Sequence, residues 1–300
     1  MDMTQNKCCR HGASLRRRRR RRRKILRSII FSCSIIAVAV FVAVGSSMIR
    51  SGDGRTNKYD VEAGNNTYDN AVIENSKISE KNKIQNNQSM LDDIMNSTQY
   101  PKQLKDLALK NEEALEFVYD YPAEHVKEHT IDLTEEASMD SVPLFVQWDK
   151  RWGYEKYSGN FFAASGCGPT TLSMVVVYLT HNREASPIAV AKYSKEAGYS
   201  VDGSGSSWTL ISEGCMHYGV KAKAVALDES RMKAELDAGH PIVVNVGPGD
   251  FTDTGHFMVI TGYDDEGFSI NDPNSIEKSG KRWLFKNISS QIRAGWSMCV

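Results

Sequence analysis

The sequence predicts an α+β domain in the C-terminal half of the chain, preceded by a single membrane-spanning helix. Three observations predict this: an uncharged run of 22 residues near the N-terminus, apolar residues at helical spacing between 167 and 238, and short apolar runs bounded by turn residues from 242 onward. Helices followed by antiparallel strands, rather than alternating with them, are typical of an α+β domain.

The basic residues gather at the N-terminus. Residues 1–50 hold thirteen Lys and Arg and one acidic residue, out of 37 of each charge in the chain. The arginine run 16–23 lies just before residues 28–49, which are uncharged and long enough to cross a bilayer as a helix. The positive-inside rule then predicts a cytoplasmic tail of residues 1–27 and an extracellular body, in a single-pass protein of the cell membrane.

Two alternatives exist for this region. The apolar run could belong to a cleaved signal peptide, with Ala43 and Gly45 at its cleavage site. We favour an uncleaved anchor because the run continues past that site to Ile49. The arginine run could bind nucleic acid, but its position beside a membrane span favours contact with anionic lipid, so no nucleic-acid partner is expected.

The chain between the anchor and the domain divides in two. Residues 50–95 are polar without a sustained apolar period, which predicts a disordered tether. Residues 96–135 contain apolar residues at helical spacing, with Asn111 placed to cap a second helix and Pro122 to stop it. We name residues 96–135 the pre-segment. We expect it to dock on the domain at 136–300. The alternative is that it shields the cleft of the domain, as a propeptide would.

The centre of the domain is Ser165-Gly166-Cys167-Gly168-Pro169-Thr170, which runs into the apolar series 172–179. Pro169 is tolerated in a first helical turn, so the pattern predicts an amphipathic helix with Cys167 at its N-terminus. The unpaired N–H groups and the helix dipole favour a thiolate there, and the thiolate is the nucleophilic form of cysteine. A buried, unreactive cysteine is the alternative.

A β-hairpin is predicted near the C-terminus, with His256 opening its first strand and Asp272 ending its second. These two positions share a face only if the loop has an odd number of residues or a bulge intervenes. We expect a three-residue loop at 264–266, which places Asp272 diagonal to His256. A carboxylate in that position orients an imidazole.

The other predicted elements of the domain follow from spacing and turn residues. The expected helices are 187–197, 208–218 and 231–238, and the expected strands are 242–246, 256–263, 268–271 and 283–285.

The cysteines divide by predicted compartment. Cys8, Cys9 and Cys33 precede or enter the span, whereas Cys167, Cys215 and Cys299 fall outside the cell. Because the number of extracellular cysteines is odd, at least one of them has no disulfide partner. If Cys215 and Cys299 formed a disulfide, Cys167 would be the free thiol. The HxxEH pattern at 125–129 resembles a zinc motif, but it lacks a third ligand, so no metal or cofactor is expected.

The motifs of the domain resemble those of a known family. The segments 143–149, 165–170, 255–257 and 271–273 together are similar to the family-39-like cysteine peptidases of the papain-like clan, which are relatives of the double-glycine peptidases that process bacteriocin leaders. The resemblance covers about residues 140–300. It implies a papain-like fold, with helices packed on an antiparallel sheet, and the activity of a cysteine peptidase.

The resemblance also implies roles for individual residues. Cys167 would be the nucleophile, His256 the general base and Asp272 the residue that orients the imidazole, with Asn271 as its rival. Gln147 and the Cys167 N–H would bind the oxyanion. Gln147 departs from the best-known relatives, in which the glutamine stands a few residues before the cysteine, where this chain has Phe161.

Trp208, Gly166 and Gly255 are the expected substrate-binding residues. The substrate would be a peptide or the peptide part of cell wall. The sequence thus predicts a membrane-anchored extracellular thiol hydrolase, with a catalytically inactive binding module of the same fold or an acyl or peptidyl transferase as alternatives. It predicts nothing about the oligomeric state.

Overall fold

The structure is a computed structural model that describes residues 65–300, with side chains from residue 79. The predicted tail 1–27, the predicted span 28–49 and residues 50–64 lie outside the described part. Within residues 65–300, none of the helices combines the length and apolarity that a bilayer crossing needs.

The elements before the domain are helical. They are α2 (Asn65–Asn96), α3 (Lys102–Lys110), the 3₁₀ turn η1 (Glu112–Ala114), α4 (Leu115–Tyr119), α5 (Tyr121–Glu124) and α6 (Thr134–Ser138). The expectation of a disordered tether is wrong for residues 65–95, which lie in α2. Apolar residues at the end of α2, including the fully buried Ile94, join the apolar cluster of the pre-segment, which supplies the burial that a polar helix otherwise lacks.

The pre-segment is docked on the domain that follows it. Phe117 and Val118 of α4 share an apolar cluster with Phe161 and Ala163. Lys150 forms an ion pair with Asp120 at 2.6 Å. Asn111 caps η1 as predicted, because its side chain accepts a hydrogen bond from the Glu113 N–H. Helix α4 ends at Tyr119, just before Pro122 as predicted, and Pro122 then lies in the first turn of the separate helix α5.

The domain contains helices, 3₁₀ turns and mostly short strands. The helical elements are α7 (Phe162–Ser165), α8 (Cys167–Thr180), α9 (Pro187–Glu196), α10 (Thr209–Ser212), η2 (Gly214–Tyr218), α11 (Glu229–Asp237), α12 (Ile276–Ser279), α13 (Phe285–Ile288) and η3 (Ser289–Gln291), the two η elements being 3₁₀ turns. The strands are β1 (Lys156–Tyr157), β2 (Asn160–Phe161), β3 (Ser200–Val201), β4 (Gly205–Ser206), β5 (Lys221–Ala224), β6 (Ile242–Val246), β7 (His256–Asp264), β8 (Gly267–Asn271), β9 (Arg282–Trp283) and β10 (Ile292–Cys299).

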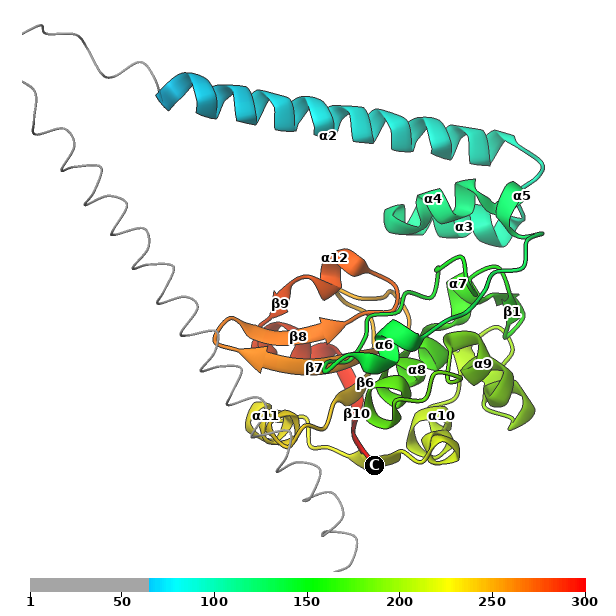
Figure 1. The fold of residues 1–300 in the computed structure, drawn as a ribbon, viewed down its shortest axis with the longest axis vertical. Coiled ribbons are helices and arrows are strands. Elements are labelled where there is room, and N and C mark those ends of the chain that lie inside the picture. The colour runs from blue at the N-terminus through cyan, green and yellow to red at the C-terminus, as the bar shows by residue number, and fades with distance from the viewer. Residues whose placement is uncertain (1–64) are drawn as a thin grey trace, which may run out of the picture. The chain divides into compact units, whose positions relative to one another are not determined.

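The main sheet has six strands in the order β5-β10-β6-β7-β8-β9, all antiparallel. Figure 1 labels β6 to β10 of this sheet. Val243 and Val259 contribute to the core that contains α8, whereas Ile242 and Val244 contribute to the core that contains Met232 and Leu236 of α11. The alternation along β6 therefore buries both faces of the sheet, one under α8 and the other under α11. The α+β class predicted from the sequence is confirmed.

Helix α8 differs from the amphipathic helix expected of it. Residues from Gly168 to Leu179 are all buried, so the helix is surrounded by protein. The predicted helix 208–218 is interrupted at Glu213, which separates α10 from η2. Strands β5 and β10 were not predicted, although β10 lies inside the sheet.

Candidate active site

Cys167 is the first residue of α8, and Gly166 precedes it as the N-cap. Its side chain is partly buried. The helix has fourteen residues, so its N-terminus directs a partial positive charge and unpaired N–H groups at the sulfur. The position is the one that the glycine-flanked motif predicted.

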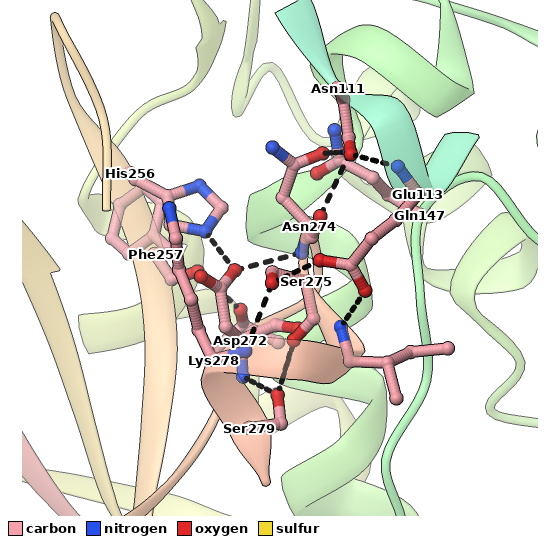
Figure 2. Close-up of polar contacts among 12 residues, drawn as sticks. Asn111, Glu113, Gln147, His256, Phe257, Asp272, Asn274, Ser275, Lys278 and Ser279 are labelled. Atoms are coloured by element: carbon pink, nitrogen blue, oxygen red, sulfur yellow. Dashed lines mark hydrogen bonds and ion pairs between the residues drawn. The ribbon is translucent and has the colours of Figure 1, made fainter. Parts of the chain in front are cut away.

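His256 and Asp272 meet at the adjoining ends of β7 and β8. The imidazole Nε2 lies 2.7 Å from Asp272 Oδ1, and both side chains are buried. A dashed line marks this contact in Figure 2. The Cys167 thiol and the His256 imidazole also interact, because each group shifts the pKa of the other. Because Nε2 is bonded to Asp272, Nδ1 is the ring nitrogen left for the thiol.

The electrostatics of the three groups favour an ion pair. Burial raises the pKa of the Cys167 thiol, but the hydrogen bond and charge of His256, with backbone hydrogen bonds at Phe257 and Gly168, lower it below its usual value. Burial lowers the pKa of His256, yet the charge of Asp272 and the hydrogen bonds of Asp272 and Cys167 raise it to about 10. A thiolate beside an imidazolium is the reactive state of a cysteine nucleophile.

The hairpin brings His256 and Asp272 to one face through a bulge. Asp264 pairs with Gly267, so the loop has two residues, and the expected three-residue loop is wrong. The register then shifts between Ile260 and Gly262, and Val259 pairs with Asn271. A two-residue loop alone would place His256 and Asp272 on opposite faces of the sheet. The extra residue of the bulge returns them to one face, and a bulge was one of the two possibilities that the sequence left open.

Comparison with known proteins decides the family. The model of the Peptidase_C39 like family matches residues 139–298, which is more than half of the chain. The chain belongs to this family. The matched part, here called the C39-like domain, contains Cys167, His256 and Asp272 together with nearly the whole sheet.

The comparisons with solved structures and with curated proteins add little to the family assignment. Among solved structures, a protein of Bacillus anthracis described as a candidate C39-like peptidase is 18% identical, with a TM-score of 0.33, over 53% of this chain and 95% of that one. We draw nothing further from a likeness at that TM-score. No curated protein matches the chain.

Asn271 does not compete with Asp272 for the imidazole. Its Nδ2 donates to the carbonyls of Val142 and Pro143, at 3.1 and 2.9 Å. Adjacent residues of a strand point to opposite faces. The C39-like domain therefore orients His256 with a carboxylate.

Gln147 contacts α7, the short helix that lies just before Cys167 in the sequence. Its Nε2 donates to the Ala163 carbonyl at 2.7 Å, and Ala163 lies in α7, just before Cys167. The side chain is 5% exposed, and its buried Oε1 has no hydrogen-bond partner. The loop between Trp148 and Asn160 thus returns the glutamine to α7, just before the cysteine, and its contact with an oxyanion stays a prediction.

The two glycines that flank Cys167 are required by close packing. A Cβ at Gly166 would lie 2.6 Å from the Phe162 ring. At Gly168 a Cβ would lie 2.5 Å from Ser206 Oγ and 2.7 Å from Ser206 Cβ. The β3–β4 hairpin therefore lies directly against the first turn of α8.

We expect Gly168→Ala to destabilise the C39-like domain. Overpacking costs about 1–3 kcal/mol, and the better helix propensity of alanine returns at most about 1 kcal/mol. Chemical denaturation should show the loss, and adding Ser206→Gly should reverse most of it. Gly262→Ala is the matched control because no neighbouring atom would lie within 4 Å of a Cβ at that position. Equal losses in both single variants, or no recovery in the double variant, would contradict this packing.

The three residues expected to bind substrate have different surroundings. Trp208 is 45% exposed, and its ring and that of Trp296 form a T-shaped pair with centroids 6.0 Å apart. Gly166 adjoins the nucleophile. Gly255 precedes His256, and a Cβ there would meet only the Val246 carbonyl at 4.0 Å, so packing does not require glycine at 255. Substrate contact by these three remains a prediction.

The remaining described cysteines are not bonded to each other. Cys215 and Cys299 form no disulfide, so the pairing considered from the sequence does not occur. Cys215 is buried, and burial raises its pKa to about 11. Cys8, Cys9 and Cys33 lie outside the described residues.

Sequence reasoning missed residues that support the site. Asn245 is buried in β6, and its Nδ2 donates to the His256 carbonyl at 3.2 Å. An asparagine within the apolar run Ile-Val-Val-Asn-Val was the signal that could have identified it, because buried amides need partners. Asn111 and Glu113 of the pre-segment were missed as well, and their spacing gives no signal of contact with residues 274–277.

Proposed function

We propose that the C39-like domain is a thiol hydrolase that cleaves peptide bonds, with Cys167 as nucleophile, His256 as general base and acid, and Asp272 as the residue that orients the imidazole. The observation that carries this proposal is the hydrogen bond between the Asp272 carboxylate and His256 Nε2, with the imidazole interacting electrostatically with the thiol at the start of α8. Membership of the Peptidase_C39 like family supports the same reaction class.

The reaction would proceed through a thioester. The Cys167 thiolate attacks the peptide carbonyl carbon, and the oxygen takes up the negative charge in contact with the Cys167 N–H and the Gln147 amide. The imidazolium of His256 then donates its proton to the leaving amine as the C–N bond breaks. Neutral His256 next takes a proton from water, which attacks the thioester and releases the carboxylic acid and the thiol group.

The place of action is proposed from the sequence. The arginine run before residues 28–49 supports a single-pass membrane anchor, with contact to anionic lipid on the cytoplasmic side and the C39-like domain outside the cell. A peptide, or the peptide part of cell wall, is the proposed substrate. Incubating the full-length protein in detergent with a peptide library and with a digest of cell-wall fragments would distinguish the two substrate classes.

Selective alkylation tests the nucleophile without a substrate. With limiting iodoacetamide at neutral pH, we expect Cys167 to react first and Cys215 to react slowly, because the pKa of Cys167 is lowered and that of buried Cys215 is raised to about 11. Peptide mapping of the alkylated full chain reads out both sites. Equal, slow labelling of the two cysteines would contradict the proposed function.

A further inference from the structure

The chain that follows Asp272 is held by residues outside the family match. The turn at 272–275 leads into α12, and both contact the 3₁₀ turn η1 of the pre-segment (Figure 2). The family model begins only at residue 139, whereas η1 comprises residues 112–114. The catalytic carboxylate and a segment more than 150 positions earlier are therefore physically connected.

Glu113 makes three of these contacts with one carboxylate. Its Oε1 accepts a hydrogen bond from the Ser275 hydroxyl. Its Oε2 accepts from the backbone N–H groups of Ile276 at 2.7 Å and Glu277 at 3.1 Å. Glu113 thus satisfies the first N–H groups of α12 from a distant part of the chain, and charge-assisted hydrogen bonds of this kind are stronger than neutral ones.

Asn274 is held from two sides. Asn111 Nδ2 donates to the Asn274 carbonyl at 2.9 Å and to Asn274 Oδ1 at 3.1 Å. The Trp148 indole N–H approaches the same carbonyl at 3.3 Å. The pre-segment and the domain therefore fix one peptide group between them.

These contacts lead directly to the atom that binds the imidazole. The Asn274 N–H donates to Asp272 Oδ1 at 2.8 Å, and that oxygen also accepts from His256 Nε2 at 2.7 Å. At the other end of α12, the Ser279 hydroxyl accepts from the Asp272 N–H at 2.9 Å. A shift of the turn or of α12 would thus move Asp272 relative to the imidazole.

The pre-segment has the rigidity needed for this task. Its helices share a core with Phe161 and Ala163, which lie close before Cys167. The Tyr154 hydroxyl donates to the Phe117 carbonyl at 2.8 Å, and a Cβ at Gly153 would lie only 2.7 Å from the Phe117 ring. One face of the pre-segment is therefore fixed to the domain while η1 holds the Asp272 turn.

We propose that Glu113 and Asn111 are positioning residues that fix the Asp272 carboxylate against His256, and that the pre-segment is a permanent part of the catalytic unit rather than a propeptide whose removal activates it. This inference rests on the proposed thiol hydrolase. It places part of the site in a region that the family model does not include.

The test compares two neighbouring glutamates in the full-length chain. Glu113→Gln keeps the shape of the side chain but removes its charge and one acceptor. Glu112→Gln is the matched control, because Glu112 is exposed and accepts instead from Asn87 Nδ2 at 2.7 Å. We expect Glu113→Gln to lower kcat for peptide cleavage about 10- to 100-fold with KM unchanged, because small displacements of catalytic groups have effects of this size. Glu112→Gln should match the wild type.

An NMR titration of the His256 imidazole provides a readout that needs no substrate. His256 faces two titratable groups, the Cys167 thiol of α8 and the Asp272 carboxyl. In Glu113→Gln the His256 pKa should fall, as Asp272 is held less closely, and Glu113→Asp should recover part of the change. A purely structural role would lower the melting temperature and leave the His256 titration and kcat of the folded protein unchanged, which would overturn the inference.

The two proposals fail in different ways. If the wild type cleaves no peptide but His256 still titrates differently in Glu113→Gln, the proposed hydrolase fails and the positioning of Asp272 stands. If the wild type cleaves peptides and Glu113→Gln equals Glu112→Gln in both readouts, the hydrolase stands and the positioning fails. Activity that increases after removal of residues 96–135 would also overturn the inference.

Discussion

Replacing Cys167 with alanine is expected to reduce kcat/KM for peptide cleavage by about 10⁴-fold or more, because no other group of the proposed triad can form the thioester. The measurement is the initial rate of cleavage of a peptide that the wild-type chain cuts. KM should change little if the substrate is bound mainly by the surface around the start of α8.

Cys215→Ala is the matched control for this variant. Cys215 is buried among apolar side chains, and burial raises its pKa to about 11. We expect a small loss of stability and full activity per folded molecule. Cleavage that persists in Cys167→Ala, or that disappears equally in Cys215→Ala, would eliminate Cys167 as the nucleophile.

Changes at Asp272 should have the second largest effect. Asp272→Ala leaves the imidazole without its partner, and we expect kcat/KM to fall about 10²- to 10⁴-fold, the range in which positioned acid–base groups contribute. Asp272→Asn retains an oxygen for His256 Nε2 and for the Asn274 N–H, so it should lose less. The two variants separate the position of the group from its charge.

The pH dependence should change in a defined direction in Asp272→Asn. His256 must be protonated to donate to the leaving amine, and Asp272 helps to raise its pKa to about 10. Without that charge the His256 pKa falls, so the alkaline limb of kcat/KM should move below about pH 10. The less protonated imidazole also stabilises the thiolate less, so alkylation of Cys167 at about pH 6 should become slower.

Stability should follow the same titration. The pKa of His256 is raised from 6.5 to about 10 in the folded protein, so protonated His256 stabilises the fold fully below about pH 6.5 and this contribution is lost as the pH rises through about 10. The difference in melting temperature between wild type and Asp272→Asn should therefore shrink as the pH approaches about 10. A difference that is constant with pH would contradict the charge interaction.

The local chemistry of the site could be predicted because its signals are local. Glycine on both sides of Cys167, with Pro169 in the first turn, indicates a helix N-terminus, and the structure begins α8 at Cys167. The even separation of His256 and Asp272 limited the hairpin to two solutions. It did not by itself choose between them, but Gly262, an isolated glycine within the strand at the register shift, was a signal that favoured the bulge.

Long-range support could not be predicted. Glu113 resembles any acidic residue in a first helical turn, and its contact with α12 depends on how the pre-segment docks. Strand β10 was missed because Arg293, Ala294 and Gly295 interrupt its apolar pattern, although pairing on both sides makes it an internal strand. Helix α2 was missed because its polar length lacks an apolar period.

The place of β10 has a consequence during synthesis. The strand order β5-β10-β6 means that residues 292–299 fill a gap between two strands that the ribosome has already produced. A nascent chain that stalls before residue 292 leaves β6, with its sequence Ile-Val-Val-Asn-Val, as an unprotected sheet edge. Incomplete translation products of this protein should therefore be prone to intermolecular strand pairing, and they should depend on holdase chaperones until the final strand has been inserted.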